Sequence, residues 1–340
     1  MKQIKTQDAV GHVLAHDITR IIKDMEKGPV FRKGHVVAPE DIPVLLSVGK
    51  EHLYVWERQE GMLHEDEAAE ILCAMCLNDH MSRTEAKEGK IEIKAEIEGL
   101  FVVDRDRLNA VNATEHMMIA TRNNYQVVKP GDKLAGTRII PLVIQQEKMD
   151  QVRETAGEEP LLKLLPFTVK TAGIVTTGSE VFHGRIQDTF TPVVKEKLAG
   201  FHIETVEHRI VNDDRDSIVE AIRQMREAGV DLILCTGGMS VDPDDQTPGA
   251  IKASGADIVS YGAPVLPGAM FLLGYFEDGT PIVGLRAADD AKATIFDLVL
   301  PRLAAGLKVK RSDLTVMGVG GLCLGCETCH YPNCGFGKGQ

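Results

Sequence analysis

Two clusters of residues in this 340-residue chain have types and spacings suited to chemistry. The first lies between Gly229 and Pro248, where an apolar run at 230–235 leads into the pair Gly237-Gly238. Such a run is typical of a strand covered on both faces of a parallel sheet. Glycines directly after the strand allow positive φ and let backbone N–H groups approach an anion, which predicts a phosphate-type loop.

Three carboxylates follow this loop, at Asp242, Asp244 and Asp245. Negative charge beside a bound phosphate makes most sense when a hard divalent cation such as Mg²⁺ bridges the two. The alternative is a polar turn in which Asp245 caps a short helix over 246–253. Both interpretations fit the turn taken by itself.

The second cluster is formed by Cys323, Cys326, Cys329 and Cys334. Their spacing resembles a ferredoxin-type run more than paired zinc knuckles, although the last gap is one residue longer and is followed by Gly335 in place of proline. The cysteines therefore predict one [4Fe–4S] cluster or one zinc ion, with a metal-free flexible tail as the remaining alternative. A further pair, Cys73 and Cys76, lies on the apolar face of a predicted helix, which favours core packing.

Composition restricts the class of protein. The chain is 44% hydrophobic and 26% charged, as expected for a soluble globular protein of two or three domains. Its net charge of -12 argues against nucleic acid as a main partner. The start of the chain lacks the apolar centre of a signal peptide, and no uninterrupted apolar run reaches the length of about 18 residues that a membrane span needs. We therefore expect a cytoplasmic protein without a membrane partner, where clustered cysteines favour metal over disulfides.

The pattern along the chain predicts four parts. An α/β region over 1–80 has a helix at 39–48, a strand at 52–56 and a helix that begins at Glu65. A β-rich module over 81–168, without a second helical layer, ends in a buried strand at 139–144, and a polar helix at 147–159 leads out of it. Residues 169–307 form the third part, and the cysteine-rich tail over 308–340 forms the fourth.

The third part alternates regularly between strands and helices. We predict strands at 171–177, 203–211, 230–235, 257–261 and 279–285, and helices from 188, at 216–228, at 246–253 and at 290–300, the last ended by Pro301. This order predicts an α/β fold of three layers, a parallel sheet with helices on both faces. Ligands of such sheets bind at the carboxyl ends of the strands, where both glycine-containing loops lie.

Several motifs in this part resemble one family. They are TTGSEV at 176–181, GRIQDT at 184–189, TGGMS at 236–240, Asp245-x-Thr247-Pro248 and Pro267-Gly268. In this order they resemble the molybdopterin-binding domain shared by molybdopterin molybdotransferases, molybdopterin adenylyltransferases and competence-damage-inducible proteins. The two preceding regions, Ser240 after the glycine pair and the segment PGAMF at 267–271 are most similar to the molybdotransferases. Two departures are LRAADD at 285–290, where that family has an LPGNP-type loop, and Ala269-Met270 in place of its lysine.

The resemblance implies an enzyme of molybdenum cofactor biosynthesis. It implies that the chain binds molybdopterin or its adenylylated form, and uses Mg²⁺ and molybdate to insert molybdenum. Asp188 and Asp245 are the implied carboxylates on Mg²⁺, with Asp242 next, although Asp188 is alternatively a helix N-cap. Arg185 is alternatively a solvated surface residue. The implied cofactor-binding residues are Thr177, Gly178, Ser179, Arg185, Thr189, Thr236, Gly237, Gly238, Ser240, Thr247, Pro267 and Gly268.

Two other functions fit the same resemblance. One is a non-catalytic carrier that presents the cofactor to a molybdoenzyme through the cysteine tail. The other is a nucleotide pyrophosphatase of the competence-damage type. Relatives in this family also imply a homodimer.

Overall fold

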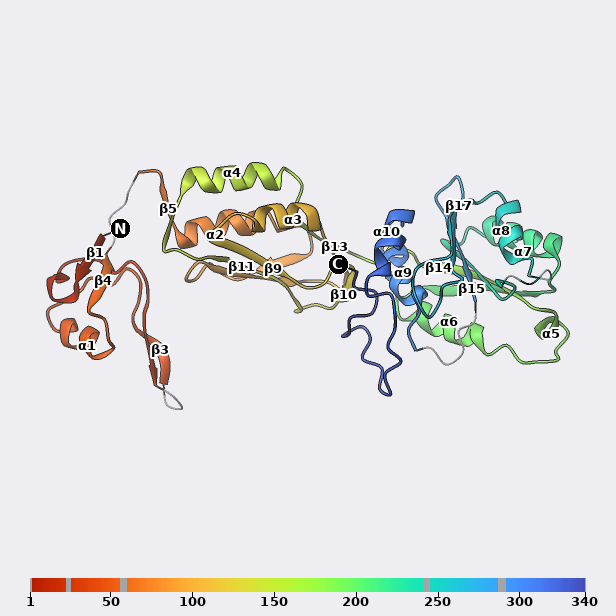
Figure 1. Cartoon of the computed structure of the whole chain (residues 1–340), viewed down its shortest axis with the longest axis horizontal. Coiled ribbons are helices and arrows are strands. Elements are labelled where there is room, and N and C mark those ends of the chain that lie inside the picture. The colour runs from red at the N-terminus through yellow and green to blue at the C-terminus, as the bar shows by residue number, and fades with distance from the viewer. Residues whose placement is uncertain are drawn as a thin grey trace. The chain divides into compact units, whose positions relative to one another are not determined.

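A computed structural model describes residues 2–22, 26–55, 60–240, 242, 245–286 and 292–339. The chain forms two compact units (Figure 1). Unit 1 consists of Met1–Glu96, Val103–Arg122 and Pro130–Lys163, and unit 2 of Ile97–Val102, Asn123–Lys129 and Leu164–Gln340. Within the described ranges, every helix is too short or too polar to span a membrane.

Unit 1 combines small antiparallel sheets with helices. Its elements are β1 (Lys2–Lys5), η1 (Thr6–Asp8), β2 (Ile18–Ile22), β3 (Glu26–Phe31), α1 (Asp41–Ser47), β4 (His52–Val55), β5 (Met62–His64), α2 (Glu65–Ala74), β6 (Met81–Arg83), β7 (Lys90–Ala95), α3 (Arg105–Asn112), β9 (Met117–Thr121), β11 (Lys133–Ile139), β12 (Val143–Gln145) and α4 (Gln146–Ala156). Its largest sheet has the order β6–β7–β11–β9. In β7, the alternation of KIEIKA buries Ile91, Ile93 and Ala95 on one face.

The predicted helix from Glu65 is confirmed as α2. It begins with a capping box, in which the backbone N–H of Asp66 donates to the His64 ring and that of His64 donates to the Glu67 carboxylate. The prediction that Cys73 and Cys76 belong to the core is also confirmed, because both are fully buried. Burial raises the pKa of Cys73 to about 11 and that of Cys76 to about 12, so both remain thiols.

Two predictions for unit 1 are wrong. The module after residue 80 carries one helix that was not predicted, α3, whereas the polar helix predicted at 147–159 is confirmed as α4. The sequence of α3 gives a weak signal because its buried stripe is only Leu108 and Val111, while Asp104 caps it by accepting from the N–H of Arg107. The strand predicted at 139–144 is broken between β11 and β12, where Ile140 is 55% exposed and Pro141 has no N–H to donate. Trp56, predicted to end a strand, lies outside the described residues.

The remaining elements belong wholly or partly to unit 2. They are β8 (Gly99–Val103), β10 (Gln126–Val128), β13 (Leu162–Leu165), β14 (Thr171–Thr177), α5 (Ser179–Phe182), α6 (Phe190–Ala199), β15 (Glu204–Val211), α7 (Arg215–Glu227), β16 (Leu232–Thr236), α8 (Thr247–Ala253), β17 (Asp257–Tyr261), β18 (Leu272–Tyr275), β19 (Pro281–Leu285), α9 (Ile295–Ala304), α10 (Arg311–Thr315) and η2 (Val316–Gly318).

The central sheet of unit 2 has the strand order β15–β14–β16–β19–β18–β17. The first four strands are parallel, and β18 runs antiparallel to both of its neighbours. The predicted α/β fold is therefore confirmed as a mixed, mostly parallel sheet. The sequence did not predict β18, because this strand of four residues follows a segment interrupted by Pro264 and Pro267.

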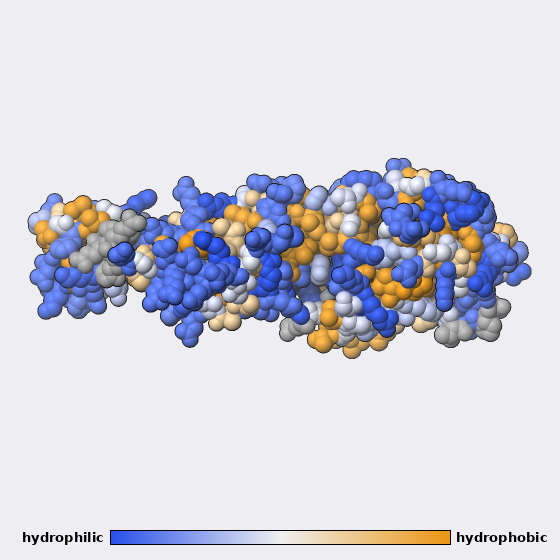
Figure 2. All heavy atoms as spheres, turned by 90° about the horizontal axis from the view of Figure 1, so that it is seen from above, coloured by the Kyte–Doolittle hydropathy of each residue, from blue (hydrophilic) through white to orange (hydrophobic). Residues whose placement is uncertain are grey.

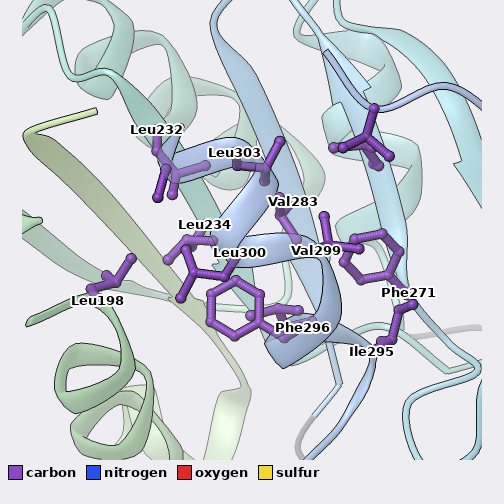
Figure 3. Packing of buried hydrophobic residues seen from close by; sticks show 14 of the residues in the cluster. Leu198, Leu232, Leu234, Phe271, Val283, Ile295, Phe296, Val299, Leu300 and Leu303 are labelled. Carbon is purple, nitrogen blue, oxygen red and sulfur yellow. The ribbon is translucent and has the colours of Figure 1, made fainter. Parts of the chain in front are cut away.

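Successive residues of the central strands face two different hydrophobic clusters. Leu232 and Leu234 of β16 pack in the cluster that contains α6 and α9, which Figure 3 shows around Phe296 and Leu300. Ile233 and Cys235 pack in the cluster that contains α7 and α8. Helices therefore cover both faces, as predicted. Burial of each such leucine or isoleucine stabilises the fold by about 1.5–3 kcal/mol.

Helix α9 differs from its prediction. A helix at 290–300 ended by Pro301 was expected, yet α9 starts at Ile295 with a Thr294–Asp297 capping box and continues through Pro301 to Ala304. Proline lacks the N–H that would bond to the carbonyl of Asp297 four residues earlier. The hydroxyl of Tyr331 donates to that carbonyl instead, at 2.8 Å. A distant tail residue thus compensates the proline. Residue 290 itself lies outside the described residues.

Hydrophilic side chains cover most of the face seen in Figure 2, with smaller hydrophobic areas between them. Scattered apolar side chains of this kind are ordinary on folded proteins and do not by themselves define a binding site.

Candidate functional site

Four loops of unit 2 follow neighbouring parallel strands at one edge of the sheet. The loops after β15, β14, β16 and β19 begin at Asn212, Gly178, Gly237 and Arg286. Because these strands are adjacent and parallel, their carboxyl ends lie side by side. Ligands of open α/β sheets bind at this edge. The two glycine-containing loops singled out in the sequence are therefore neighbours.

The glycine pair after β16 packs tightly against two threonines. Gly237 has φ +87°, and a Cβ placed there would lie 2.2 Å from the carbonyl oxygen of Thr177. A Cβ on Gly238, at φ +56°, would lie 2.6 Å from the hydroxyl oxygen of Thr247. The hydroxyls of Thr177 and Thr247 are themselves 3.1 Å apart. The two loops and the start of α8 thus form one close-packed corner that leaves no space for side chains at either glycine.

A buried network of hydroxyl groups lies beneath the loops. The hydroxyl of Thr236 donates to Thr176 at 3.0 Å, and the Thr176 oxygen is 2.9 Å from that of Thr191 and 3.0 Å from Nε2 of His208. Asp188 joins the network through Thr176, at 3.5 Å. Thr236 is only 2% exposed. Its side chain therefore connects β14 to β16 and does not face solvent.

Asp188 stands at the start of α6. Its Oδ1 accepts the backbone N–H groups of Phe190 and Thr191, both at 3.0 Å, which is the geometry of a helix N-cap. Desolvation would raise the pKa of Asp188, but the hydrogen bonds from Thr191 and Phe190 and the field of His208 hold it below its ordinary value. Asp188 is therefore an ionised carboxylate at neutral pH.

The loop after β15 supplies residues that the sequence argument did not include. The backbone N–H of Ser179 donates to Oδ2 of Asp213 at 2.7 Å, and the Ser179 hydroxyl donates to Asn212 at 2.7 Å. The other carboxylate oxygen of Asp213 is buried without a hydrogen-bond donor from any described residue. A free carboxylate oxygen beside a predicted phosphate loop is a suitable ligand for Mg²⁺. The signal in the sequence was the polar run Asn212-Asp213 directly after a strand.

The acidic segment after the glycine pair is only partly described. The backbone N–H of Asp245 donates to the carbonyl of Asp242 at 3.0 Å, which places the two acids in one turn. Burial raises the pKa of Tyr261, with a contribution from the Asp245 charge, and the Tyr261 hydroxyl donates to the carbonyl of Met239 at 3.0 Å. Ser240 and Asp245 are half-buried and Asp242 is exposed, whereas Asp244 lies outside the described residues. Asp245 does not cap α8.

The remaining predicted residues lie around this edge in different environments. Arg185 and Thr189 are exposed, in the segment between α5 and α6. Pro267 accepts the N–H of Ile295 at 3.3 Å, and Gly268 packs against Ile295, so both support the start of α9. The departure at 285–290 is described only at Leu285 and Arg286.

A comparison with known protein families finds a match in the part of the chain that carries these loops. Residues 173–305 match the family described as "Probable molybdopterin binding domain". This segment is a domain of that family. Residues 3–57 match a second family, described as a domain of unknown function (DUF8806).

Several known proteins are similar to parts of the chain. A CinA-like protein of Mycobacterium tuberculosis (strain ATCC 25177 / H37Ra) is 43% identical over 77 residues, which cover 22% of this chain and 18% of the relative. The match thus spans less than a fifth of that curated relative. The structure of the molybdopterin biosynthesis enzyme MoaB from Thermus thermophilus aligns with 40% of this chain and 97% of its own, at 26% identity and a TM-score of 0.36. A molybdenum cofactor biosynthesis protein from Pyrococcus furiosus aligns with 91% of this chain and 66% of its own, at 15% identity and a TM-score of 0.29.

The cysteines of the tail do not converge in this structure. Cys326 and Cys329 are exposed, while Cys323 and Cys334 are half-buried against the core of the molybdopterin-binding domain. Within the described residues, the one group of three ligand atoms that lie within 4.8 Å of one another is His64, Glu65 and Asp66, in unit 1. The predicted metal site of the tail therefore requires the loop to rearrange.

The His64 group is a poor metal site. Nδ1 of His64 accepts the N–H of Asp66, and its Nε2 lies 3.1 Å from the carbonyl of Ala15. The ammonium of Lys33 lies 3.0 Å from Nδ1 of His64 and 2.7 Å from Asp66. Both ring nitrogens are thus engaged, and a lysine already supplies the positive charge that a metal would bring.

Glu65 gives this region a pH-dependent stability. Burial, reinforced by the Asp66 charge, raises the pKa of Glu65 from 4.5 to about 7, although Lys33 opposes the shift. The folded state therefore holds this proton up to higher pH than the unfolded state, so stability present below pH 4.5 is lost as pH rises through about 7. We expect Glu65→Gln to flatten this slope and to raise the free energy of unfolding at pH 8 by about 1–3 kcal/mol relative to wild type.

Urea unfolding of the full chain at pH 5 and pH 8 measures this effect. Glu85→Gln, an exposed carboxyl in the same unit, is the matched control and should leave the slope unchanged. Equal pH slopes for wild type and Glu65→Gln would show that Glu65 does not titrate in this interval.

Proposed function

We propose that this chain binds molybdopterin or its adenylylated form at the carboxyl edge of the unit 2 sheet and promotes the insertion of molybdenum. The observation that carries the proposal is the family match over residues 173–305, whose glycine-containing loops lie on adjacent parallel strands. Backbone N–H groups of such loops stabilise phosphate charge without a basic surface, which suits a chain with a net charge of -12. The proposal places the protein in the cytoplasm as a transferase similar to molybdopterin molybdotransferases.

The proposal assigns carboxylates of this edge to a magnesium ion, which requires them to draw closer together, because no three of them in the described part of the chain lie within 4.8 Å of one another. Asp188 is ionised, one buried oxygen of Asp213 has no hydrogen-bond partner among the described residues, and Asp245 is half-buried in the same turn as Asp242. When bound, Mg²⁺ would neutralise pyrophosphate charge and orient the bond that is cleaved. The task of the protein is then positional: the Gly178 and Gly237 loops hold the phosphates, and Asp188 is fixed by the start of α6. The hydroxyl of Ser240 remains as a donor to the substrate. The same proposal assigns the tail cysteines to a [4Fe–4S] cluster or a zinc ion.

AMP release from adenylylated molybdopterin tests this function. The anaerobically purified protein is incubated with the adenylylated substrate, Mg²⁺ and molybdate, and AMP is measured with and without molybdate. An oxygen from molybdate or water bonds to phosphorus as the P–O–P bond breaks, which releases AMP. When the dithiolene then binds molybdate through both sulfurs, one oxo ligand leaves as water with the two thiol protons. We expect release that depends on molybdate.

Other outcomes would identify the alternative functions. Tight binding without AMP release would support a cofactor carrier for a molybdoenzyme. Hydrolysis of simple dinucleotides without any pterin would support a pyrophosphatase, an activity to examine because of the sequence similarity to a CinA-like protein. Either result would contradict the molybdotransferase proposal. Light scattering at several protein concentrations tests the homodimer.

A further inference from the structure

The four tail cysteines lie in one loop that is closed at its neck. The N–H of Gly337 donates to the carbonyl of Gly320 at 2.9 Å, so residues 321–336, with all four thiols, form a single excursion of the chain. A closed loop of this kind limits how far the thiols can separate. Its spacing of two, two and four intervening residues is suited to four ligands on one centre.

The base of this loop is fixed to unit 2 at three places. The N–H of Cys323 donates to the carbonyl of Leu266 and the N–H of Leu266 donates to Gly321, both at 2.8 Å. Tyr331 donates its hydroxyl to Asp297 in α9, and Phe336 is 5% exposed in the core. Cys323 and Cys334 therefore stand on a rigid base, while Cys326 and Cys329 lie at the exposed end.

Arg302, in the helix α9 to which Tyr331 of this loop donates, is a buried cation that forms no ion pair within the described residues. Arg302 of α9 is 7% exposed, and its Nε has no hydrogen-bond partner among the described residues. Its guanidinium stacks on Tyr125 at 3.6 Å, and no ion pair joins it to a carboxylate in the described part of the chain. The Asp313 carboxylate, which accepts the N–H of Lys310 at 2.7 Å, acts on Arg302 through its field and forms no ion pair with it. A buried charge of this kind is costly unless negative charge is supplied nearby.

Tyr331 connects this cation to the cysteines. It is half-buried and donates to Asp297 of α9, the helix that carries Arg302, and the fields of Cys334 and Arg302 both act on its hydroxyl group. Tyr331 and Cys334 also pack against the same hydrophobic cluster, which contains Phe336 and α9. Negative charge at Cys334 would therefore develop beside the cluster that contains residues of α9, the helix that carries Arg302.

We propose that Cys323, Cys326, Cys329 and Cys334 bind one metal centre as a tetrathiolate, and that Arg302 is the positioning residue whose buried charge stabilises it. Four thiolates around Zn²⁺ or around a [4Fe–4S]²⁺ core carry a net charge of about −2 in either case. The inference rests on the tail metal of the proposed function and adds its ligand set and its counter-charge. It is independent of molybdopterin.

Metal analysis of the full chain tests the ligand set. After anaerobic purification, iron, sulfide and zinc are measured per chain, and metal-free protein is titrated with Co²⁺, whose absorption reports thiolate ligands. We expect one centre per chain, and Cys326→Ser should reduce metal affinity by at least about tenfold without unfolding, since Cys326 is exposed. Glu327→Gln, at the neighbouring exposed position, is the control. Iron with sulfide, or zinc alone, identifies the occupant, and a chain that binds neither overturns both the tail metal and this inference.

Arginine variants test the counter-charge. Arg302→Gln should weaken metal binding in chelator competition by about tenfold or more, whereas Arg302→Lys, which keeps the charge, should remain within about threefold of wild type. Arg311→Gln, an exposed cation in the tail, is the control. Equal losses in the Gln and Lys variants, or no loss in either, would overturn the role of Arg302 while leaving the metal in place. If Arg302→Gln does not fold, Arg302→Lys is the deciding variant. A tenfold loss of metal affinity in Arg302→Lys, which keeps the charge, would contradict an effect of charge.

Discussion

Asp245→Asn is expected to reduce molybdate-dependent AMP release by at least about a hundredfold, with little change in the thermal unfolding temperature. The loss follows from the proposed magnesium ion, because removal of one charged group that stabilises a transition state costs about 10²–10³ in rate. Stability should be retained because Asp245 is half-buried, does not cap α8 and enters the turn through its backbone N–H. Initial rates at saturating Mg²⁺, together with unfolding followed by circular dichroism, measure both quantities.

Asp188→Asn extends this test. Asparagine also caps helices, so the contacts to Phe190 and Thr191 can remain while the charge is lost. A large loss of AMP release would then reflect charge, whereas Asp188→Ala should also lower stability by about 1 kcal/mol through the missing cap. Glu180→Gln, an exposed carboxyl near the same loop, is the control. Full activity in both Asn variants would contradict the proposed metal bridge.

Gly237→Ala is expected to destabilise the protein by about 3 kcal/mol or more. Alanine at φ +87° is strained by about 1–2 kcal/mol, and its Cβ would lie 2.2 Å from the carbonyl oxygen of Thr177, a backbone atom that cannot simply rotate away. Such a loss should lower the unfolding temperature by about 6 °C or more. Calorimetry of the full chain measures it.

Gly229→Ala separates the energetic cost of backbone strain from that of a steric clash. Gly229 has φ +70°, and a Cβ placed on it would meet no atom within 4 Å, so alanine there experiences backbone strain alone. We expect a loss of about 1–2 kcal/mol. A loss in Gly237→Ala no larger than in Gly229→Ala would mean that the Gly237–Thr177 corner relaxes freely.

The elements of unit 2 could be predicted where local pattern and burial agree. The apolar runs of β14 and β16 are buried on both faces, and the amphipathic stripe of α7 buries Ile218, Ile222 and Met225. The same reasoning failed where a distant residue changes a local rule. A proline within a helical sequence usually marks the end of the helix. At Pro301, however, the Tyr331 hydroxyl donates to the Asp297 carbonyl that the proline leaves without a donor, and no pattern within α9 indicates this contact.

The residues of the candidate site likewise fall into two groups, those that local motifs predict and those that only the fold brings together. The Gly237-Gly238 loop and Asp188 follow from sequence because their motifs are local. The contacts of His208 with Thr176 and of Asp213 with Ser179 join residues 32 and 34 positions apart, and only the sheet order brings them together. The buried pairing of Thr177 with Thr247 likewise needs β14 and α8 to meet.

Because the Tyr331 hydroxyl donates to Asp297 in α9, this domain can be transferred intact to another protein only together with the tail. A transplant of residues 173–305 alone would keep Pro301 but leave the Asp297 carbonyl without its donor in the middle of α9. It would also remove the chain paired with Leu266, next to Pro267-Gly268. A chimaera that preserves α9 must therefore take residues 306–339 as well, so in this chain the portable module is longer than the family match.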